Sequence, residues 1–478
     1  MKRIFVSLLI ASIFTASGFA QKAKPKKAVK PTVSTAEKPI VKQQGLEVPF
    51  VNKVLANGFE IIVLADNSVP LVTIELVARN GSITEPLELN GLSHLYEHMF
   101  FKPNGAIVDG EEYLRDIDQL GIVYNGTTRE EVVNYYFTTT SPYLDTAMRY
   151  MKDSALRPTF NEDEFASEKQ VVIGEIDRNE SNPFFYLSRT MSDKLFSKYP
   201  TRKNPLGTRE TVNAATTEKM RLIQNRYYVP NNSALIVTGD VKPAEVFAIA
   251  EKYFGVWKRR SVDPFKEFPL VEHPPLSKSE GFIVEQPVNN VLIQVGWHGP
   301  SIGKDDAATY SADVFSYILG QPDSRFQRNL VDSGLTNIAD ITYYTQRNVG
   351  PITLTLAVSP EKAKEAIRVA HAEIAKFNEA NYFTDEELEN AKSLLESRDL
   401  FEREKLSEYA HTLGFWWSST GIEYFRGYQK NLRAVSREDI KRYVSTYIQN
   451  KPRIGVALIS SEAQSKIKLS ANDLTGVK

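Results

Sequence analysis

The 478-residue sequence contains no cysteine. That absence excludes a disulfide framework, a thiolate nucleophile, a zinc site with cysteine ligands and an iron–sulfur cluster. A strong net charge is also missing, because 58 basic side chains stand against 59 acidic ones. No overall electrostatic field therefore favours a nucleic acid as a partner. The chain is 42% hydrophobic and 24% charged, a composition typical of soluble globular proteins that bury sizeable cores.

Long apolar runs are rare too, and the clearest one lies at the N-terminus. Residues 4–20 are mostly apolar or small, follow Lys2 and Arg3, and end at Ala20. A basic head, a short apolar run and small residues at its end are the layout of a secretory signal peptide. We therefore predict cleavage near Ala20 and a periplasmic or secreted mature chain without a membrane anchor. The alternative is a signal anchor that stays attached.

The segment after this run, residues 21–45, carries seven lysines, three prolines and one acidic side chain. Such a composition favours a solvated tether over a folded element or a nucleic-acid-binding arm. We therefore predict that the folded part of the chain begins near residue 46.

One order of strands and helices occurs twice after residue 46. The patterns of the first copy predict strands at 59–64, 72–77, 132–140 and 233–240, and helices at 162–179 and 217–228. Prolines and mixed charges interrupt the pattern over 256–279, and strands return at 291–297, 352–358 and 453–459. We predict an N-terminal domain over 46–257, a linker over 258–279 and a C-terminal domain over 280–478.

Two short segments allow the copies to be aligned. Residues 160–165 read Phe-Asn-Glu-Asp-Glu-Phe, and residues 383–388, at an offset of 223, read Phe-Thr-Asp-Glu-Glu-Leu. Each opens a helix with carboxylates in its first turn, where the helix dipole favours them. We therefore predict an α+β fold with two homologous halves, each a largely antiparallel sheet packed with helices. The alternative is a chance coincidence of amphipathic patterns.

Two of the six histidines belong to one five-residue motif, His94-Leu-Tyr-Glu97-His98. Residues four apart on a helix lie one turn above each other, so both imidazoles can bind the same ion. Glu97 lies on the neighbouring flank, where a carboxylate can act as a base on water. The spacing indicates metal-assisted hydrolysis, and the alternative is two histidines packed in a structural helix face.

A catalytic zinc site of this kind needs a third protein ligand. Glu168 and Glu175 are seven residues apart, which places both carboxylates on one face of a predicted helix. Either one can reach a metal from a second helix. On spacing alone, however, they read more readily as solvated helix charges.

These motifs together make the family recognisable. The chain resembles the insulinase-like (pitrilysin, M16) zinc peptidases over residues 47–460, and most closely the bacterial members related to mitochondrial processing peptidase. The His-x-x-Glu-His motif is the inverted zinc motif of the inverzincins. The resemblance is carried by Gly91–Lys102, Asn125–Glu130, Glu168–Arg178, Pro205–Gly207 and Tyr228–Val241.

The resemblance implies a role for each site residue. It makes His94, His98 and Glu175 the ligands of one zinc ion per chain and Glu97 the base that activates water. It also makes Glu168 a residue that orients a ligand, and it places Asn125 beside the scissile region of the substrate. The family holds its peptide as an added strand on a sheet edge, between two halves that enclose a peptide chamber.

The second half lacks the metal-ligand pattern of the first, and a single zinc site facing a silent half is the arrangement that the resemblance implies. At the offset of 223, Glu168 falls on Ala391 and Glu175 on Arg398, so this half is expected to hold no metal. The other four histidines are interpreted as structural or surface residues: His273, His298, His371 and His411.

Family members commonly place an Arg and a Tyr seven residues apart in a silent half to bind substrate. Arg325 and Arg328 are the candidates here, but the residues seven positions later are not tyrosines. Tyr343 and Tyr344 are possible substitutes. We therefore hypothesise a two-chain enzyme in which a homologous zinc-free partner, or a second copy of this chain, completes the substrate site.

The sequence thus predicts a zinc metalloendopeptidase that hydrolyses unfolded peptides or small protein fragments. The alternative is a non-catalytic subunit that binds peptides or scaffolds an assembly. Zinc is preferred over manganese or cobalt only by family habit, because two imidazoles and a carboxylate suit several divalent ions.

Overall fold

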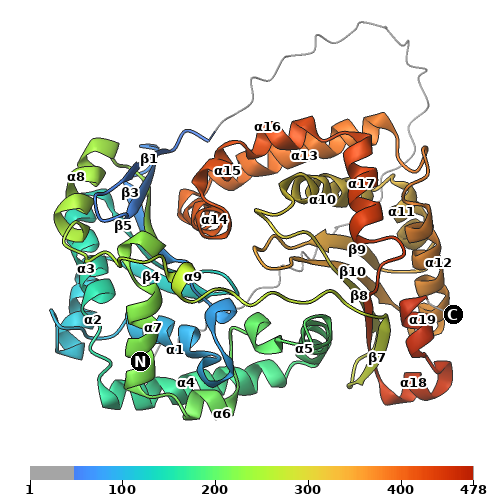
Figure 1. Cartoon of the computed structure of the whole chain (residues 1–478), viewed down its shortest axis with the longest axis horizontal. Coiled ribbons are helices and arrows are strands. Elements are labelled where there is room, and N and C mark those ends of the chain that lie inside the picture. Colours follow the sequence, from blue (N-terminus) through green and yellow to red (C-terminus); the bar gives the residue numbers. More distant parts are fainter. Residues whose placement is uncertain (1–47, 477–478) are drawn as a thin grey trace, which may run out of the picture. The chain divides into compact units, whose positions relative to one another are not determined.

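Two β-sheets organise residues 48–476, which are the residues that the computed structural model describes. The first sheet has the strand order β1-β2-β6-β3-β5-β4, and the second has the order β7-β11-β8-β10-β9 (Figure 1). The strands of the first sheet are β1 (Val51–Val54), β2 (Glu60–Ala65), β3 (Leu71–Ala78), β4 (Val123–Thr128), β5 (Val133–Thr140) and β6 (Ser233–Gly239). Those of the second are β7 (Glu280–Glu285), β8 (Val291–His298), β9 (Ile338–Tyr343), β10 (Pro351–Val358) and β11 (Ile454–Ile459).

The predicted signal peptide (residues 1–20), the predicted tether (residues 21–45) and the predicted start of the N-terminal domain at residue 46 lie outside the described residues. Within residues 48–476, no helix has both the length and the apolar character needed to cross a membrane.

Five strands of the first sheet are arranged in the same order as the five strands of the second sheet. Strands β2, β6, β3, β5 and β4 correspond in order to β7, β11, β8, β10 and β9, and β1 is an addition to the first sheet. Each sheet contains one parallel pair, β2 with β6 and β7 with β11, and its other pairs are antiparallel. The prediction of two homologous, largely antiparallel α+β halves is confirmed.

One face of each sheet is covered by helices that belong to the same half of the chain as the sheet. In the first half, α1, α3, α7 and α8 bury apolar side chains against the sheet, and α10, α12 and α17 do the same in the second. The helices of the first half are α1 (Leu92–Phe100), α2 (Gly110–Gln119), α3 (Leu144–Leu156), α4 (Glu162–Glu180), α5 (Pro183–Leu195), α6 (Arg209–Asn213), α7 (Thr217–Tyr227), α8 (Pro243–Phe254) and α9 (Pro264–Glu267). Those of the second are α10 (Asp306–Leu319), α11 (Arg325–Gln327), α12 (Ala363–Lys376), α13 (Asp385–Arg403), α14 (Leu406–Ser419), α15 (Ile422–Arg426), α16 (Tyr428–Ala434), α17 (Arg437–Tyr447), α18 (Ser461–Ile467) and α19 (Ala471–Thr475).

The long helices α4 and α13 carry the repeat that aligned the two copies. Each has 19 residues, and their first residues, Glu162 and Asp385, differ by the predicted offset of 223. Asn161 caps α4 and Thr384 caps α13, and each capping side chain accepts hydrogen bonds from the first turn. Because both starts have an acidic first turn and a polar cap, the local sequence determines where these helices begin.

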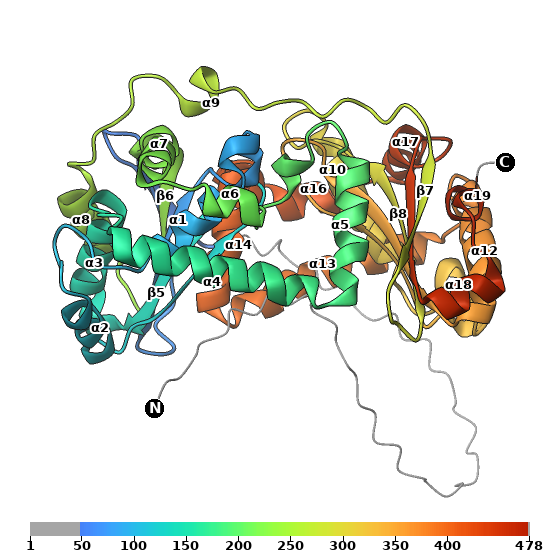
Figure 2. The same ribbon diagram turned by 90° about the horizontal axis from the view of Figure 1, so that it is seen from below.

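The opposite face of each sheet is covered by a helix from the other half. Helix α14 of the second half buries Tyr409, Leu413 and Trp417 against β2 and β6 of the first sheet. Helix α5 of the first half buries Leu187 and Met191 against β11 of the second sheet. Figure 2 shows α5 beside this sheet. Neither half therefore completes its own core. The domain boundaries that the sequence predicts at residues 257 and 280 stay a prediction.

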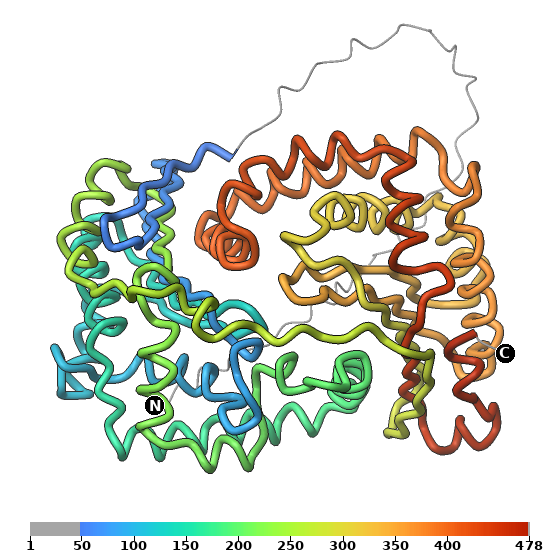
Figure 3. The backbone as a smooth tube through the Cα atoms, in the orientation of Figure 1, coloured from blue at the N-terminus to red at the C-terminus, as the bar shows by residue number. Residues whose placement is uncertain are grey.

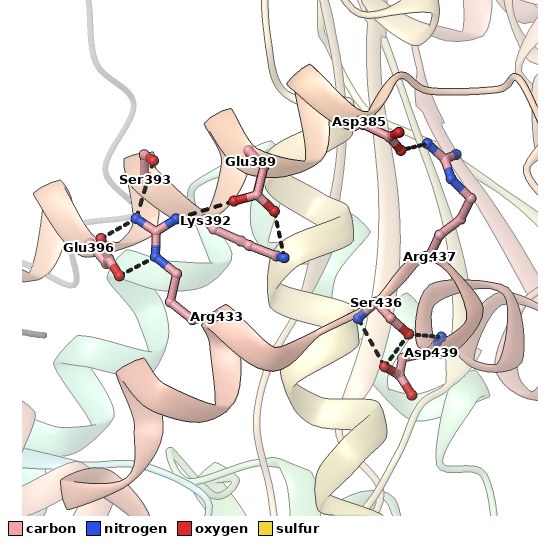
Figure 4. Close-up of polar contacts among 9 residues, drawn as sticks. All are labelled: Asp385, Glu389, Lys392, Ser393, Glu396, Arg433, Ser436, Arg437 and Asp439. Carbon is pink, nitrogen blue, oxygen red and sulfur yellow. Dashed lines mark hydrogen bonds and ion pairs between the residues drawn. The ribbon is translucent and has the colours of Figure 1, made fainter. Parts of the chain in front are cut away.

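Helix α13, which leads into the exchanged helix α14, is held by two arginines from the neighbouring helices. Arg433 of α16 contacts Glu396 and lies 3.5 Å from Glu389, and Arg437 of α17 lies 2.7 Å from Asp385 (Figure 4). Exposed ion pairs of this kind contribute little individually, but a network along one helix fixes its position. The connection between the halves passes through α9 before entering β7 (Figure 3).

Candidate metal centre

Helix α1, which carries the His-x-x-Glu-His motif, begins at a tightly packed glycine. Gly91 has a positive φ of 87°, and an added Cβ would lie 2.7 Å from the Cα of Gly207. The buried carboxylate of Glu85 accepts hydrogen bonds from the backbone N–H of Gly91, at 2.8 Å, and of Ser93, at 2.6 Å. A carboxylate at a helix N-terminus satisfies amides that have no partner within the helix. These contacts fix the start of the helix that presents the histidines.

The histidines of α1 and a carboxylate of α4 meet at one point. The Oε2 atom of Glu175 lies 3.5 Å from Nε2 of His94 and 3.7 Å from Nε2 of His98. The three residues offer ligand atoms that all lie within 4.8 Å of one another, and no other group of this kind occurs among residues 48–476. Their side chains are only 14–15% exposed. Two nitrogen donors and one carboxylate oxygen around a common point match the ligand set of a catalytic divalent-metal site.

The environment of His98 also fits a bound cation. Its Nδ1 atom lies 3.0 Å from Oε2 of Glu168, whose other oxygen lies 2.5 Å from the ammonium of Lys102. Burial acts to lower the pKa of His98, but its contacts with Glu168 and Glu175 raise that pKa to about 10. A proton on His98 therefore offsets part of the negative charge of Glu168 and Glu175, and a divalent cation can take over that role. With Nδ1 donating to Glu168, Nε2 presents a lone pair to the metal position.

His94 is kept neutral by a different cause. Burial, followed by the nearby His98, lowers the pKa of His94 to about 3. Its Nδ1 atom is buried without a hydrogen-bond partner, so Nε2, which faces Glu175, is the atom that can bind an ion. A neutral imidazole is the form that ligates metals.

The side chain of Glu97 extends from α1 towards the edge strand β4. Thr128 Oγ1 donates a hydrogen bond to Oε2 of Glu97 at 2.8 Å. Gly126 leaves room for the same side chain, because an added Cβ would lie 2.6 Å from its Cγ. Burial raises the pKa of Glu97 to about 7, which suits a carboxyl group that both accepts and donates a proton near neutral pH. Sequence analysis missed Glu85, Gly126 and Thr128, since none belongs to a metal-ligand spacing.

The predicted substrate-binding residues lie in different places. Asn125 is exposed on β4, on the face of the strand opposite to Gly126. Arg325 lies within the second half, 3.4 Å from Glu373 and 3.0 Å from Glu379. Arg328 is exposed at the start of the short π-helix Arg328–Asp332. The structure therefore places Asn125, but neither arginine, on the strand that contacts Glu97.

The second half repeats the geometry of the centre with different chemistry. The burial pattern along residues 311–319 of α10 is the same as that along residues 92–100 of α1. Asp313, Ser316 and Tyr317 thus stand where His94, Glu97 and His98 stand. Arg398, the counterpart of Glu175, donates a hydrogen bond from Nη1 to the hydroxyl of Tyr317 at 2.8 Å. A guanidinium takes the place of a metal ligand there.

The chain is similar to known proteins over most of its length. Residues 61–209 match the family model described as "Insulinase (Peptidase family M16)", and residues 214–395 match "Peptidase M16 inactive domain". The zinc protease PqqE of Helicobacter pylori is 22% identical over 401 residues, which cover 83% of this chain and 89% of that protein. The uncharacterized zinc protease YmxG of Bacillus subtilis is 26% identical over 341 residues, which cover 70% of this chain and 80% of that protein.

Solved structures share the fold. A protease from Helicobacter pylori superposes with a TM-score of 0.76 at 22% identity, covering 86% of this chain and 99% of that chain. The first half of the periplasmic protease PqqL from Escherichia coli superposes with a TM-score of 0.72 at 17% identity. The match covers 88% of this chain and 94% of that chain. The two family models adjoin each other and together span most of the sequence. The chain belongs to the insulinase-like M16 peptidase family.

Proposed function

We propose that this chain is a zinc-dependent endopeptidase that hydrolyses unfolded peptides or small protein fragments. The observation that carries the proposal is the meeting of His94, His98 and Glu175 at one point, with Glu97 on its flank. The description of the relatives PqqE and YmxG as zinc proteases supports zinc as the metal.

Each residue then has a defined task. His94, His98 and Glu175 would hold the zinc, and Glu168 would orient His98 through Nδ1. When bound, zinc supplies a Lewis acid that polarises a carbonyl group and lowers the pKa of water.

Glu97 would act as general base and then as general acid. Its Oε2 atom already accepts from Thr128, so Oε1 is the atom that takes a proton from the attacking water and returns it to the leaving amine. A pKa of about 7 allows both transfers near neutral pH.

The peptide would bind along β4. This strand is the edge of the first sheet, so its outer backbone groups are available to an added strand. Because Gly126 and Thr128 contact Glu97, a peptide paired with β4 passes the base and the metal ligands. Asn125 lies on the same strand and would contact the peptide near the scissile bond. The peptide is proposed to bind in a chamber formed by the halves and a partner.

We further propose that the chain is the active subunit of a two-chain enzyme. Neither Arg325 nor Arg328 is followed seven residues later by a tyrosine, and Arg325 is engaged by carboxylates of its own half. A zinc-free homologue or a second copy would supply the missing substrate contacts. The predicted signal peptide and the periplasmic location stated for the structural neighbour PqqL support activity in the periplasm or outside the cell.

The replacement Glu97→Gln tests the catalytic role. We expect the variant to retain its metal, measured by elemental analysis, and to lose peptide hydrolysis by several powers of ten, because the metal ligands stay while the base is removed. Glu164→Gln, on the same face of α4 as Glu168, is the matched control and should keep both. Unchanged hydrolysis in Glu97→Gln would place the activity elsewhere and favour a non-catalytic peptide-binding subunit.

The two-chain hypothesis is tested by assaying the mature chain alone and with a homologous neighbour. We expect hydrolysis of a fluorogenic peptide to rise on mixing, and size-exclusion chromatography shows whether the chain forms a homodimer. Full activity from an isolated monomer would remove the hypothesis. A chelator should abolish hydrolysis, and added zinc should restore it.

A further inference from the structure

A cavity of about 310 Å³ lies between the first sheet and the exchanged helix α14. Its walls come from both halves of the chain. The residues that line it are Glu75, Thr127, Arg129, Val132, Asn134, Glu402, His411, Thr412, Phe415 and Trp416. The volume is at the lower end of the range for small-molecule pockets and is ample for one side chain of a peptide.

The cavity lies across β4 from Glu97. Thr127 pairs with Asn134 in the sheet register, and both belong to the face that α14 covers. Its neighbours Gly126 and Thr128 point to the other face, where they contact Glu97. Successive side chains of a strand alternate between the two faces of a sheet. A peptide added to β4 therefore directs alternate side chains towards the metal ligands and towards this cavity.

The inner end of the cavity is built around a buried carboxylate. Glu75 is 0% exposed, and Asn134 Nδ2 donates a hydrogen bond to its Oε1 at 2.8 Å. Nδ1 of His411 contacts Oε2 of the same carboxylate. Both oxygens of Glu75 are thus engaged, and Nε2 of His411 is the ring nitrogen left for a ligand.

Two basic side chains, His411 and Arg129, belong to the lining of this cavity. Burial acts to lower the pKa of His411, but Glu75 and then Glu408 raise it above the ordinary value and so favour the protonated ring, in which Nε2 is a hydrogen-bond donor. Arg129 adds a second cation at the wall. The remaining lining carboxylate, Glu402, is already bound by Arg398 at 2.8 Å. A ligand tip that accepts hydrogen bonds and carries negative charge therefore suits the cavity.

The apolar wall suits the stem of such a side chain. Phe415 and Val132 line the cavity beside the polar groups, so methylene groups can pack there while the tip reaches His411. A lysine or arginine would instead bring its charge to His411 and Arg129. We propose that this cavity is a subsite for an acidic side chain of the peptide, preferably glutamate, with His411 and Arg129 as the residues that bind its carboxylate. The proposal rests on the proposed peptidase function, because it assumes that a peptide pairs with β4.

The test is a binding scan that does not require hydrolysis. A neutral, unfolded peptide is synthesised with a single Glu, Gln, Lys or Leu moved along its length. Each peptide competes with a fluorescent reference peptide on the zinc-loaded Glu97→Gln chain. We expect one position at which Glu binds about tenfold more tightly than Gln, the size of one charge-assisted hydrogen bond, and Lys more weakly than Gln. The adjacent positions should show no preference, because their side chains face away from the cavity.

Two variants identify the residues responsible. His411→Gln and Arg129→Gln should each reduce the Glu-over-Gln preference to near one, because each removes a positive charge that favours a carboxylate over an amide. His371→Gln is the matched control, since His371 bonds to Leu474 O in the second half, and it should keep the preference. If His411→Gln unfolds, Arg129→Gln still decides the point, because Arg129 is exposed.

Several results would overturn the subsite. These are the absence of any position that prefers Glu, a tighter Lys or Leu peptide at the preferred position, or a preference that survives both variants. Failure of the proposed function gives a different result. In that case the wild-type chain loaded with zinc hydrolyses none of these peptides, while the binding preference for Glu is still present.

Discussion

Nδ1 of His98 lies 3.0 Å from Oε2 of Glu168, and this contact joins the helix that carries two of the proposed metal ligands to the helix that carries the third. Replacing the carboxylate with an amide in Glu168→Gln removes the charge that fixes the ring and its tautomer. We expect metal affinity to fall by about 10- to 100-fold, as for other residues that orient a metal-bound histidine. Competition with a chelator measures the affinity.

The control for this change is Glu164→Gln. Glu164 lies one turn earlier on α4 and contacts the same Lys102, at 3.5 Å, but does not touch His98. It should leave metal affinity unchanged. Equal losses in both variants would show that the charge of Lys102, rather than the orientation of His98, controls the site.

Gly126 gives a second prediction, because it is the part of β4 that lies against the proposed base. A Cβ there would lie 2.6 Å from Cγ of Glu97, so in Gly126→Ala the flexible Glu97 side chain must move. We expect peptide hydrolysis to fall at least tenfold through a lower kcat, with metal content and folding retained. Gly174→Ala is the control: it neighbours Glu175, but an added Cβ there meets nothing within 4 Å. It should keep full activity and gain up to about 1 kcal/mol of stability from the better helix former.

Much of the fold follows from local sequence. The strands predicted at 72–77, 233–240 and 352–358 agree with β3, β6 and β10 to within one residue at each end. The starts of α4 and α13 follow from their caps and acidic first turns. These features depend on neighbouring residues, so a single sequence is enough to predict them.

Strand β4 shows why other parts of the fold and the site could not be predicted from the sequence alone. Its Asn125-Gly126 pair is a typical turn signal, yet both residues lie within Val123–Thr128. The strand is determined by pairing with β5 and by the need for space beside Glu97, which are contacts between distant residues. For the same reason, spacing alone left Glu175 open as a ligand, and only the family resemblance favoured it. The roles of Arg325 and Arg328 in substrate binding stay a prediction.

The exchange of α5 and α14 predicts that the two halves unfold together. Leu413 of α14 is fully buried against the first sheet, and Leu187 of α5 is buried against the second. We expect Leu413→Ala and Leu187→Ala each to cost about 2–5 kcal/mol, as for other buried leucines, and to lower one shared calorimetric transition. Leu394→Ala, on the exposed side of α13, is the control and should change stability by less than about 0.5 kcal/mol. Two separate transitions in either core variant would show that the halves are independent.

His273 makes the stability of the chain sensitive to acid. It is 6% exposed, and both of its ring nitrogens are buried without a hydrogen-bond partner. Burial, and then the charge of Lys203, lowers its pKa to about 3, whereas a histidine in an unfolded chain titrates near 6.5. The unfolded chain therefore binds this proton more readily than the folded chain. The contribution of the neutral ring is complete above pH 6.5 and is lost as the pH falls towards 3.

Removing the titrating ring in His273→Phe should remove that dependence. Phe196 and Tyr199 already pack against the His273 ring, so an aromatic replacement keeps the contacts. The free energy of unfolding, from urea titrations at pH 8 and pH 5, gives the difference between wild type and variant at each pH. At pH 8 the difference reports packing alone, because both proteins are neutral at this position. We expect the difference to shift in favour of the variant at pH 5, since only the wild type loses stability through this group, and an equal difference at both pH values would mean that His273 does not contribute.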